Sequence, residues 1–282
     1  MPWWFRIAAK IALARLPVGY RLWQRLSLFR HGAMDDSGYA LRCFQEHYEA
    51  AGRPGSEAGF SALELGPGDS LISALIVRAM GGNSCWLVDA GPFARTDTAH
   101  YRAMAQDLQR AGVPAPDLAR AQSLADILHQ CQSRYLTRGL ASLREVPTGS
   151  VDFIWSQAVL EHVRADEFAE TARELRRVQS AHGVSSHRID LRDHLGGALN
   201  NMRFSPKLWE SAFMVRSGFY TNRLGYTAIV EAFRAAGFDV TVTQVDRWTR
   251  LPTPRSRMAA CFRDRPEEDL LVSGFNVVLR PI

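Results

Sequence analysis

Lysine, cysteine and long apolar runs are all scarce in this chain of 282 residues. Lys10 and Lys207 are the only lysines among 34 basic residues, so arginine supplies nearly all of the positive charge. No Cys-x-x-C pair occurs, and the four cysteines are scattered at Cys43, Cys85, Cys131 and Cys261. This spacing argues against a disulfide framework and a zinc site, and it favours a reducing cytoplasm.

A bilayer-spanning segment is also missing, because no uncharged run approaches the roughly 18–20 apolar residues that a spanning helix needs. The apolar stretch 2–16 is interrupted by Arg6 and Lys10, and no convincing small-residue cleavage site follows it. These features argue against a secretory signal peptide.

Acidic residues are absent from residues 1–34, whereas six basic residues lie there. The remaining 248 residues hold 28 basic and 29 acidic side chains and are therefore almost neutral. A nucleic-acid-binding protein is expected to carry its basic footprint on the body. The charge distribution therefore predicts that nucleic acid is not the substrate.

Residues 1–34 are predicted to form a basic, amphipathic helical arm. Pro17 separates the first apolar stretch from a second one, whose apolar residues are Tyr20, Leu22, Trp23, Leu26 and Phe29. The arm could pack over the body or between subunits, with its arginines in water. Alternatively, residues 1–30 could lie on the surface of an anionic membrane, at the inner face of the cell membrane.

The most informative motif is Leu-Glu-Leu-Gly-Pro-Gly-Asp at residues 63–69, between an expected strand and an expected helix. Glycines let the backbone approach a ligand closely, and the start of a helix presents free N–H groups. Asp89 follows about twenty residues later, after a second apolar strand, where a carboxylate can bind a ribose diol. We therefore predict a nucleoside site, against the alternative of a strand–turn–helix without a ligand.

A dinucleotide-binding turn, Gly-x-Gly-x-x-Gly, is not matched because Leu71 occupies the third glycine position. Asp69 would also repel a pyrophosphate, whereas a carboxylate favours a sulfonium or an amino group. This argues against a nicotinamide oxidoreductase.

Three segments together resemble the class I S-adenosylmethionine-dependent methyltransferases: residues 64–69, Asp89, and Val-Asp-Phe-Ile-Trp-Ser-Gln-Ala-Val-Leu-Glu-His at 151–162. The resemblance covers about residues 38–282 and implies S-adenosylmethionine as cofactor. Many relatives place an acidic residue after the third strand, but 139–143 contains none, so the adenine would be recognised by backbone groups, Ser142 or apolar contacts. The candidate cofactor-binding residues are Glu64, Gly66, Pro67, Gly68, Asp69, Asp89, Ala90, Ser142, Ser156 and Gln157.

The body, residues 35–282, is predicted to be one α/β domain with a Rossmann-like, doubly wound, mostly parallel seven-stranded sheet. Strands are expected at 60–65, 84–89, within 134–143, and at 151–157, 184–191, 240–245 and 270–279. Helices are expected at 35–51, 70–80, 96–111, 117–132, 160–180 and 225–237. The resemblance adds that the last strand is antiparallel and inserted before the sixth.

Ligands of open α/β sheets bind beyond the carboxyl ends of the strands, which here are Ser156-Gln157 and the segment 187–194. A methyl acceptor with a hydroxyl group needs a base, and histidine titrates near neutrality. We expect His187 to be the general base, then His194, with Asp190 orienting it. A metal site of His187, Asp190, Asp193 and His194 and a purely structural role remain alternatives; no metal is assigned, and His162 is expected to support the cofactor loop.

The connection 192–225 is predicted to be an insertion that builds the acceptor pocket. Its aromatic and amide side chains suit a sugar or polyol, or equally a packed lid: Asn200, Asn201, Phe204, Trp209, Phe213, Phe219, Tyr220 and Asn222. The segment 186–194 also resembles methyltransferases associated with bacterial surface glycans.

We therefore expect O-methylation of a glycan or a hydroxylated small molecule. The alternatives are an N-methyltransferase, a small-metabolite tailoring enzyme, and a cofactor-binding partner subunit without catalysis. The oligomeric state is not predicted.

Overall fold

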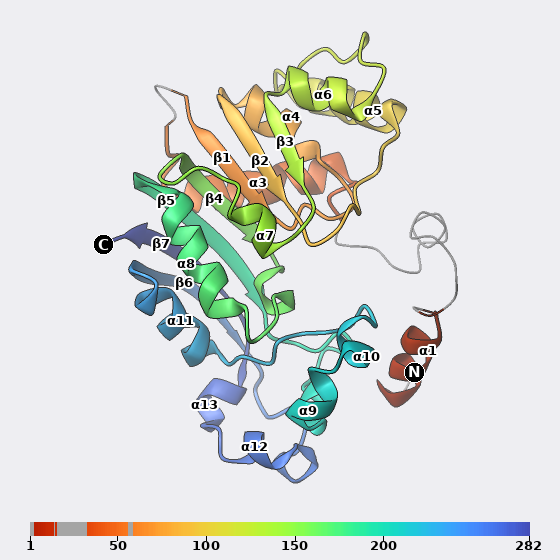
Figure 1. The fold of residues 1–282 in the computed structure, drawn as a ribbon, viewed down its shortest axis with the longest axis vertical. Helices are drawn as coiled ribbons and strands as arrows, with labels where there is room; N and C mark the ends of the chain where they lie inside the picture. The colour runs from red at the N-terminus through yellow and green to blue at the C-terminus, as the bar shows by residue number, and fades with distance from the viewer. Residues whose placement is uncertain (1–2, 14, 16–32, 56–58) are drawn as a thin grey trace.

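A seven-stranded sheet in the order β3-β2-β1-β4-β5-β7-β6 forms the centre of the computed structural model, which describes residues 3–13, 15, 33–55 and 59–282 (Figure 1). The five strands from β1 to β5 run parallel, and β7 runs antiparallel to both β5 and β6. This confirms the predicted fold, including the position of the last strand. The strands are β1 (Ser61–Leu65), β2 (Ser84–Val88), β3 (Ser133–Leu136), β4 (Val151–Gln157), β5 (Gln179–Asp190), β6 (Phe238–Arg247) and β7 (Val272–Pro281).

Helices cover both faces of the sheet because its strands send alternate side chains to two separate apolar layers. On β4, Phe153 and Trp155 pack with one layer, whereas Ile154 between them packs with the other. The first layer includes α3 (Ser37–Ala50), α4 (Ile72–Ala79), α5 (Thr98–Arg110) and α6 (Leu124–Gln130). The second includes α7 (Leu140–Leu143), α8 (Phe168–Val178) and α11 (Tyr226–Ala235).

The third strand lies at the start of the stretch 134–143 in which it was expected, and the helix expected at 160–180 is shorter than predicted. After β3, Gly139 turns the chain with φ +54°, and the Ser142 hydroxyl accepts a hydrogen bond from the Arg138 N–H, so a short helix forms instead. The other helix starts as an isolated 3₁₀ turn, Leu160–His162, and resumes only at α8. The Asn222 amide donates to the carbonyls of Leu160 and Val163, which removes these carbonyls from helical bonding.

The insertion after β5 folds into three short helical turns, and the N-terminal helix packs on it (Figure 1). Ile7 of α1 (Trp3–Leu13) lies in one apolar cluster with Leu195 and Trp209. The first part of the arm therefore packs over the body, which is the first of the two alternatives given above for the arm. The second apolar stretch of the arm, at residues 20–29, lies outside the described residues. The turns of the insertion are a 3₁₀ turn (Asn200–Arg203), α9 (Pro206–Trp209) and α10 (Ala212–Val215).

The connection between β6 and β7 carries a 3₁₀ turn (Arg255–Arg257), α12 (Ala260–Arg263) and α13 (Glu267–Leu270). Its apolar residues Met258 and Phe262 share a cluster with Leu199 and Met202, so this connection packs against the insertion. Within the described parts of the chain, no helix is both long enough and apolar enough to cross a bilayer.

Candidate functional site

The turn after β1 has a backbone that only glycine adopts easily. Gly66 and Gly68 have φ angles of +74° and +67°, in the left-handed region that side chains disfavour. A Cβ atom on Gly66 would lie 2.5 Å from a methyl carbon of Val159, which follows β4. The buried Pro67 lies between them. The turn is therefore packed tightly against the segment after β4, and it lies at the carboxyl end of β1.

Asp89 ties this turn to the end of β2. One carboxylate oxygen accepts a hydrogen bond from the Gly68 N–H at 2.9 Å, and the other accepts from the Ala90 N–H at 2.7 Å. Each carboxylate oxygen can accept more than one hydrogen bond. Asp89 can thus still bind the two hydroxyl groups of a ribose, and the exposed Ala90 leaves the approach open.

Two tyrosines hold the loops around this turn, and no sequence motif marked them. The Tyr101 hydroxyl accepts from the Leu71 N–H at 3.2 Å and donates to the Arg95 carbonyl at 2.8 Å. The Tyr135 hydroxyl donates to the Gly91 carbonyl at 2.9 Å. These bonds fix the walls of the site from the side of α5 and β3.

The acidic residues beside the turn favour a cationic ligand. Burial raises the pKa of Glu64 to about 8, and one of its carboxylate oxygens has no hydrogen-bond partner among the described residues. Asp69 is also buried, directly after the turn. A sulfonium or an ammonium group nearby would favour the charged form of Glu64. The residues present therefore fit S-adenosylmethionine, with Asp89 for its ribose and the acidic groups for its charged end.

Gln157, at the end of β4, is held by a histidine that the sequence did not indicate. The His47 Nε2–H donates to the Gln157 amide oxygen at 3.0 Å, and His47 Nδ1 accepts from the Ser186 hydroxyl at 2.8 Å. Burial lowers the pKa of His47 to about 4, so its ring is neutral. This bond fixes the amide with its NH₂ group turned away from His47.

Two serines that were expected to contact the cofactor are used inside the fold instead. Ser156 is fully buried, and its hydroxyl lies 2.7 Å from His187 Nδ1. Ser142 is 1% exposed and binds the Arg138 N–H.

The expected pairing of His187 with Asp190 does not occur. His187 is fully buried, its ring stacks on Phe233 with centroids 6.1 Å apart, and burial lowers its pKa to about 3. Asp190 instead accepts two hydrogen bonds from the Arg192 guanidinium, at 2.8 and 2.7 Å. Because His187 and Asp190 are three residues apart on one strand, their side chains point to opposite faces of the sheet. The expectation that His187 meets the acceptor is wrong for this geometry.

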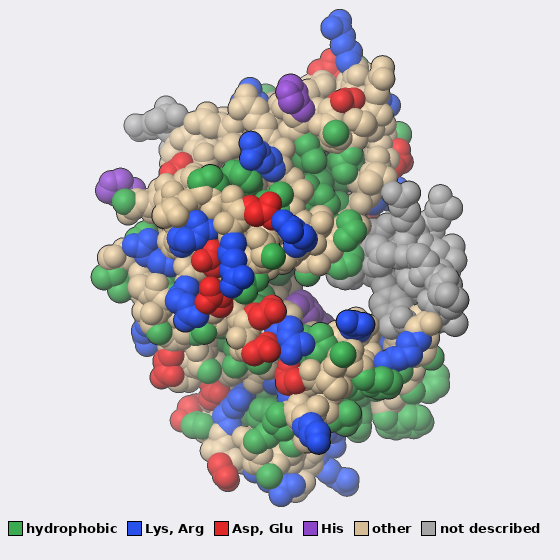
Figure 2. Space-filling model, viewed as in Figure 1, with side chains coloured by type: hydrophobic (Ala, Val, Ile, Leu, Met, Phe, Trp, Pro, Cys, Tyr) green, Lys and Arg blue, Asp and Glu red, His purple; other side chains and the backbone are tan. Residues whose placement is uncertain are grey.

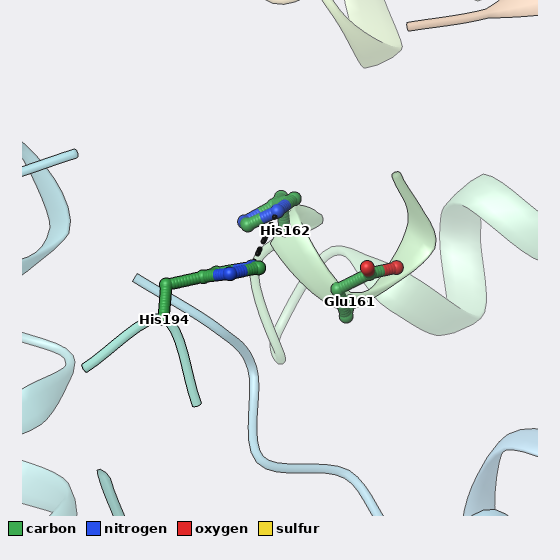
Figure 3. Close-up of side chains that lie close together, drawn as sticks. All are labelled: Glu161, His162 and His194. Carbon is green, nitrogen blue, oxygen red and sulfur yellow. Dashed lines mark hydrogen bonds between the residues drawn. The ribbon is translucent and has the colours of Figure 1, made fainter. Parts of the chain in front are cut away.

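His194 forms its pair with His162, which was expected only to support the cofactor loop (Figure 3). Their Nε2 atoms lie 3.1 Å apart, and their rings stack with centroids 4.7 Å apart. His162 Nδ1–H donates to the Tyr220 carbonyl at 2.7 Å, so His162 Nε2 carries the lone pair. His194 then donates from Nε2, and its own lone pair is on Nδ1.

The pair lies where a polar acceptor can reach it. His162 is exposed and His194 is half-buried. Burial lowers the pKa of His194, and the neighbouring Asp190 acts in the opposite direction. His194 is therefore mainly neutral at pH 7 and able to accept a proton.

The expected metal ligands are not assembled into one site. His187 and Asp190 have the separate partners given above, and Asp193 accepts from the N–H groups of Leu195 and Ala198 to shape its loop. Glu161, His162 and His194 do each place one ligand atom within 4.8 Å of the others. In the view of Figure 3, however, the Glu161 carboxylate points away from both rings.

The aromatic and amide side chains of the insertion form mostly a packed lid. Trp209, Phe219 and Tyr220 are buried, and the Trp209 Nε1–H donates to the Thr221 carbonyl at 2.7 Å. The amide of Asn201 donates to the Thr221 hydroxyl at 2.8 Å. These groups are thus occupied, and among the expected aromatic residues Phe213 is the one that is half exposed.

Residues 63–185 match a family model described as a methyltransferase domain. No significant match was found among curated proteins. Three solved structures are similar in outline: an S-adenosylmethionine-dependent methyltransferase from Mesorhizobium loti, another from Methanosarcina mazei, and a chain of the complex between the Haloferax volcanii Trm112 methyltransferase activator and a methyltransferase.

The Mesorhizobium protein is 16% identical, with a TM-score of 0.43, over 80% of this chain and 92% of that one. The Methanosarcina protein is 14% identical, with a TM-score of 0.46, over 80% and 94%. The Haloferax chain is 15% identical, with a TM-score of 0.43, over 87% and 93%. Similarity at this level carries no argument about acceptor or partner.

The family match lies on the residues that build the site, because it runs from the strand before the glycine turn to the middle of β5. Together with the sheet order and the Asp89 geometry, it supports an S-adenosylmethionine-dependent methyltransferase. S-adenosylmethionine is its cofactor.

Proposed function

We propose that this protein transfers a methyl group to an oxygen atom of a hydroxylated acceptor, either a glycan or a small molecule. The observation that carries the proposal is the His162–His194 pair, whose Nε2 atoms lie 3.1 Å apart, with His162 exposed. S-adenosylmethionine supplies the methyl group and, as a sulfonium, takes up the electron pair of the broken C–S bond. The protein must hold the acceptor in line and remove its proton.

The histidine pair removes that proton as the acceptor oxygen bonds to the methyl carbon. His194 takes the proton on Nδ1, which carries its lone pair. The imidazolium that results still donates from Nε2 to His162, whose orientation is fixed by the Tyr220 carbonyl. The nearby Asp190 favours the charged ring. An alcohol needs this assistance, whereas a neutral amine attacks without a base, so the pair favours an oxygen acceptor.

The test compares single alanine variants of the histidines in transfer of labelled methyl to cell-extract fractions. His194→Ala should lower the rate by roughly 10²–10⁴-fold, the usual contribution of a general base, with unchanged cofactor affinity. His182→Ala, on the exposed part of β5, is the matched control and should retain full activity. Full activity of His194→Ala would overturn the base assignment.

Two further readouts separate the alternatives. Because burial lowers the pKa of His194, the rate should rise with pH below about 6.5, the ordinary pKa of histidine, and stay level above it. Loss of activity with a chelator, restored by a divalent cation, would favour a metal at the Glu161 cluster instead. Cofactor binding without turnover in every fraction would favour a non-catalytic partner subunit.

A further inference from the structure

Exposed apolar side chains gather on one part of the surface. Among the described residues, five large apolar side chains are exposed, and four of them lie on α1, α9 and α10. The fifth, Ile282, lies at the C-terminus, on the other side of the molecule from α1 (Figure 1). Two segments about 200 residues apart in sequence, packed against each other, carry these four side chains, which we call the apolar patch: Trp4, 59% exposed; Phe5, 45%; Leu208, 46%; and Phe213, 50%.

The fold holds the patch in place. Trp3 packs edge-to-face on Phe204 with centroids 6.1 Å apart, and Ile7 is buried against the insertion, so the inner face of α1 is fixed. The Arg15 guanidinium donates to the Phe213 carbonyl at 3.1 Å and lies 3.9 Å from the centre of its ring. The outward side chains of α1 are therefore held beside those of the insertion.

The surroundings of the patch are basic. Arg6 and Arg15 belong to the N-terminal segment, and Lys207 and Arg216 belong to the insertion, while residues 195–222 contain one acidic residue, Glu210. Glu210 is occupied, because it accepts from the Tyr220 hydroxyl at 2.7 Å and pairs with Arg223 at 3.3 Å. Figure 2 shows basic and apolar side chains side by side in this region.

We propose that the apolar patch and its basic rim dock this protein on an anionic membrane surface. Aromatic side chains beside Lys and Arg, with no free acid, match the interfacial region of a bilayer with anionic headgroups. Each apolar side chain of this size gains from leaving water, and each basic side chain gains from anionic lipid.

The patch is connected directly to the histidine pair. The Lys10 ammonium donates to the His194 carbonyl at 3.4 Å, and Tyr220, whose carbonyl orients His162, lies in the same apolar cluster as Ile7. Docking would therefore hold the pair close to the lipid surface, where a lipid-anchored hydroxylated acceptor can reach it. This last step rests on the proposed function, whereas the docking itself does not.

The test is co-sedimentation of the full chain with vesicles of phosphatidylcholine, with and without phosphatidylglycerol. The wild type should bind the anionic vesicles and lose binding with added salt. Two double variants remove the patch in halves, Trp4→Ser with Phe5→Ser and Leu208→Ser with Phe213→Ser. Each should weaken vesicle binding by about tenfold or more. Ile282→Ser removes an even more exposed apolar side chain, 84% exposed, far from the patch, and this variant should bind as the wild type does.

Cofactor affinity, measured on the same variants, shows that the fold is intact. The proposal would be overturned if the protein bound both kinds of vesicle and the paired variants did not weaken that binding. It would also be overturned if the wild type did not bind anionic vesicles. A concentration-dependent dimer that the paired variants abolish would show that the patch joins two copies of the chain, and would also overturn it. Vesicle binding without any methyl transfer would count against the proposed function alone.

Discussion

Replacement of Asp89 by alanine removes the acceptor that joins the glycine turn to the end of β2. The Gly68 and Ala90 N–H groups would lose their partner, at a cost of about 1–3 kcal/mol each if no water replaces it. Since Ala90 is exposed, water can reach it, and we expect a loss of about 2 kcal/mol in unfolding free energy.

The effect on the cofactor should be larger than the effect on stability. Two hydroxyl hydrogen bonds to a charged acceptor contribute about 1.5–3 kcal/mol each. Their loss corresponds to a decrease of roughly 10²–10⁴-fold in affinity for S-adenosylmethionine. Asp89→Asn should fall between wild type and alanine, because the amide keeps one oxygen but turns an NH₂ group toward another donor.

Calorimetric titration gives the affinity, and urea unfolding gives the stability of the same samples. Asp117→Ala is the matched control, since its carboxylate also accepts from a backbone N–H, that of Ala119 at 2.9 Å, but lies in an exposed loop. This variant should bind the cofactor normally. If Asp89→Ala bound within threefold of the wild type, the placement of the ribose at Asp89 would be refuted.

Two further predictions concern the same site. Gly66→Ala should abolish detectable cofactor binding, because its Cβ would lie 2.5 Å from Val159 in a left-handed backbone; circular dichroism would check that the fold survives, and normal binding would contradict the tight turn. With a pKa of about 8, Glu64 is about nine-tenths protonated at pH 7. A cationic cofactor should lower that pKa and release nearly one proton on binding, and affinity should rise between pH 7 and pH 9. Titration in buffers of different ionisation enthalpy measures this release, which Glu64→Gln should abolish; equal release by that variant would exclude Glu64 as its source.

The sheet could be predicted because the relevant signals are local in the sequence. The apolar runs at β1, β2 and β4 are bounded by glycine, proline or charged residues, and the turn at 66–68 is marked by its glycines. The helix 160–180 was predicted too long because the Asn222 amide, sixty residues later, takes the carbonyls of Leu160 and Val163. A hydrogen-bond donor so far away in the sequence does not change the periodicity of apolar residues from which a helix is predicted.

The expected pairing of His187 with Asp190 was wrong for a related reason. His187 and Asp190 are close in sequence, but the alternation of the strand separates them, and the core buries His187 against Phe233. His162 and His194 are 32 residues apart and meet through the ends of β4 and β5. Pairs of this kind depend on the loop after each strand, where the sequence carries no periodic signal.

We expect S-adenosylmethionine bound at the glycine turn to give its methyl group to an oxygen that His194 deprotonates. The most direct measurement is the transfer of labelled methyl from S-adenosylmethionine into lipid, glycan and small-molecule fractions, followed by identification of the labelled atom. We expect label on oxygen, lost in both Asp89→Ala and His194→Ala, with cofactor binding retained in the second variant. Label on nitrogen, or unchanged transfer by His194→Ala, would contradict the account.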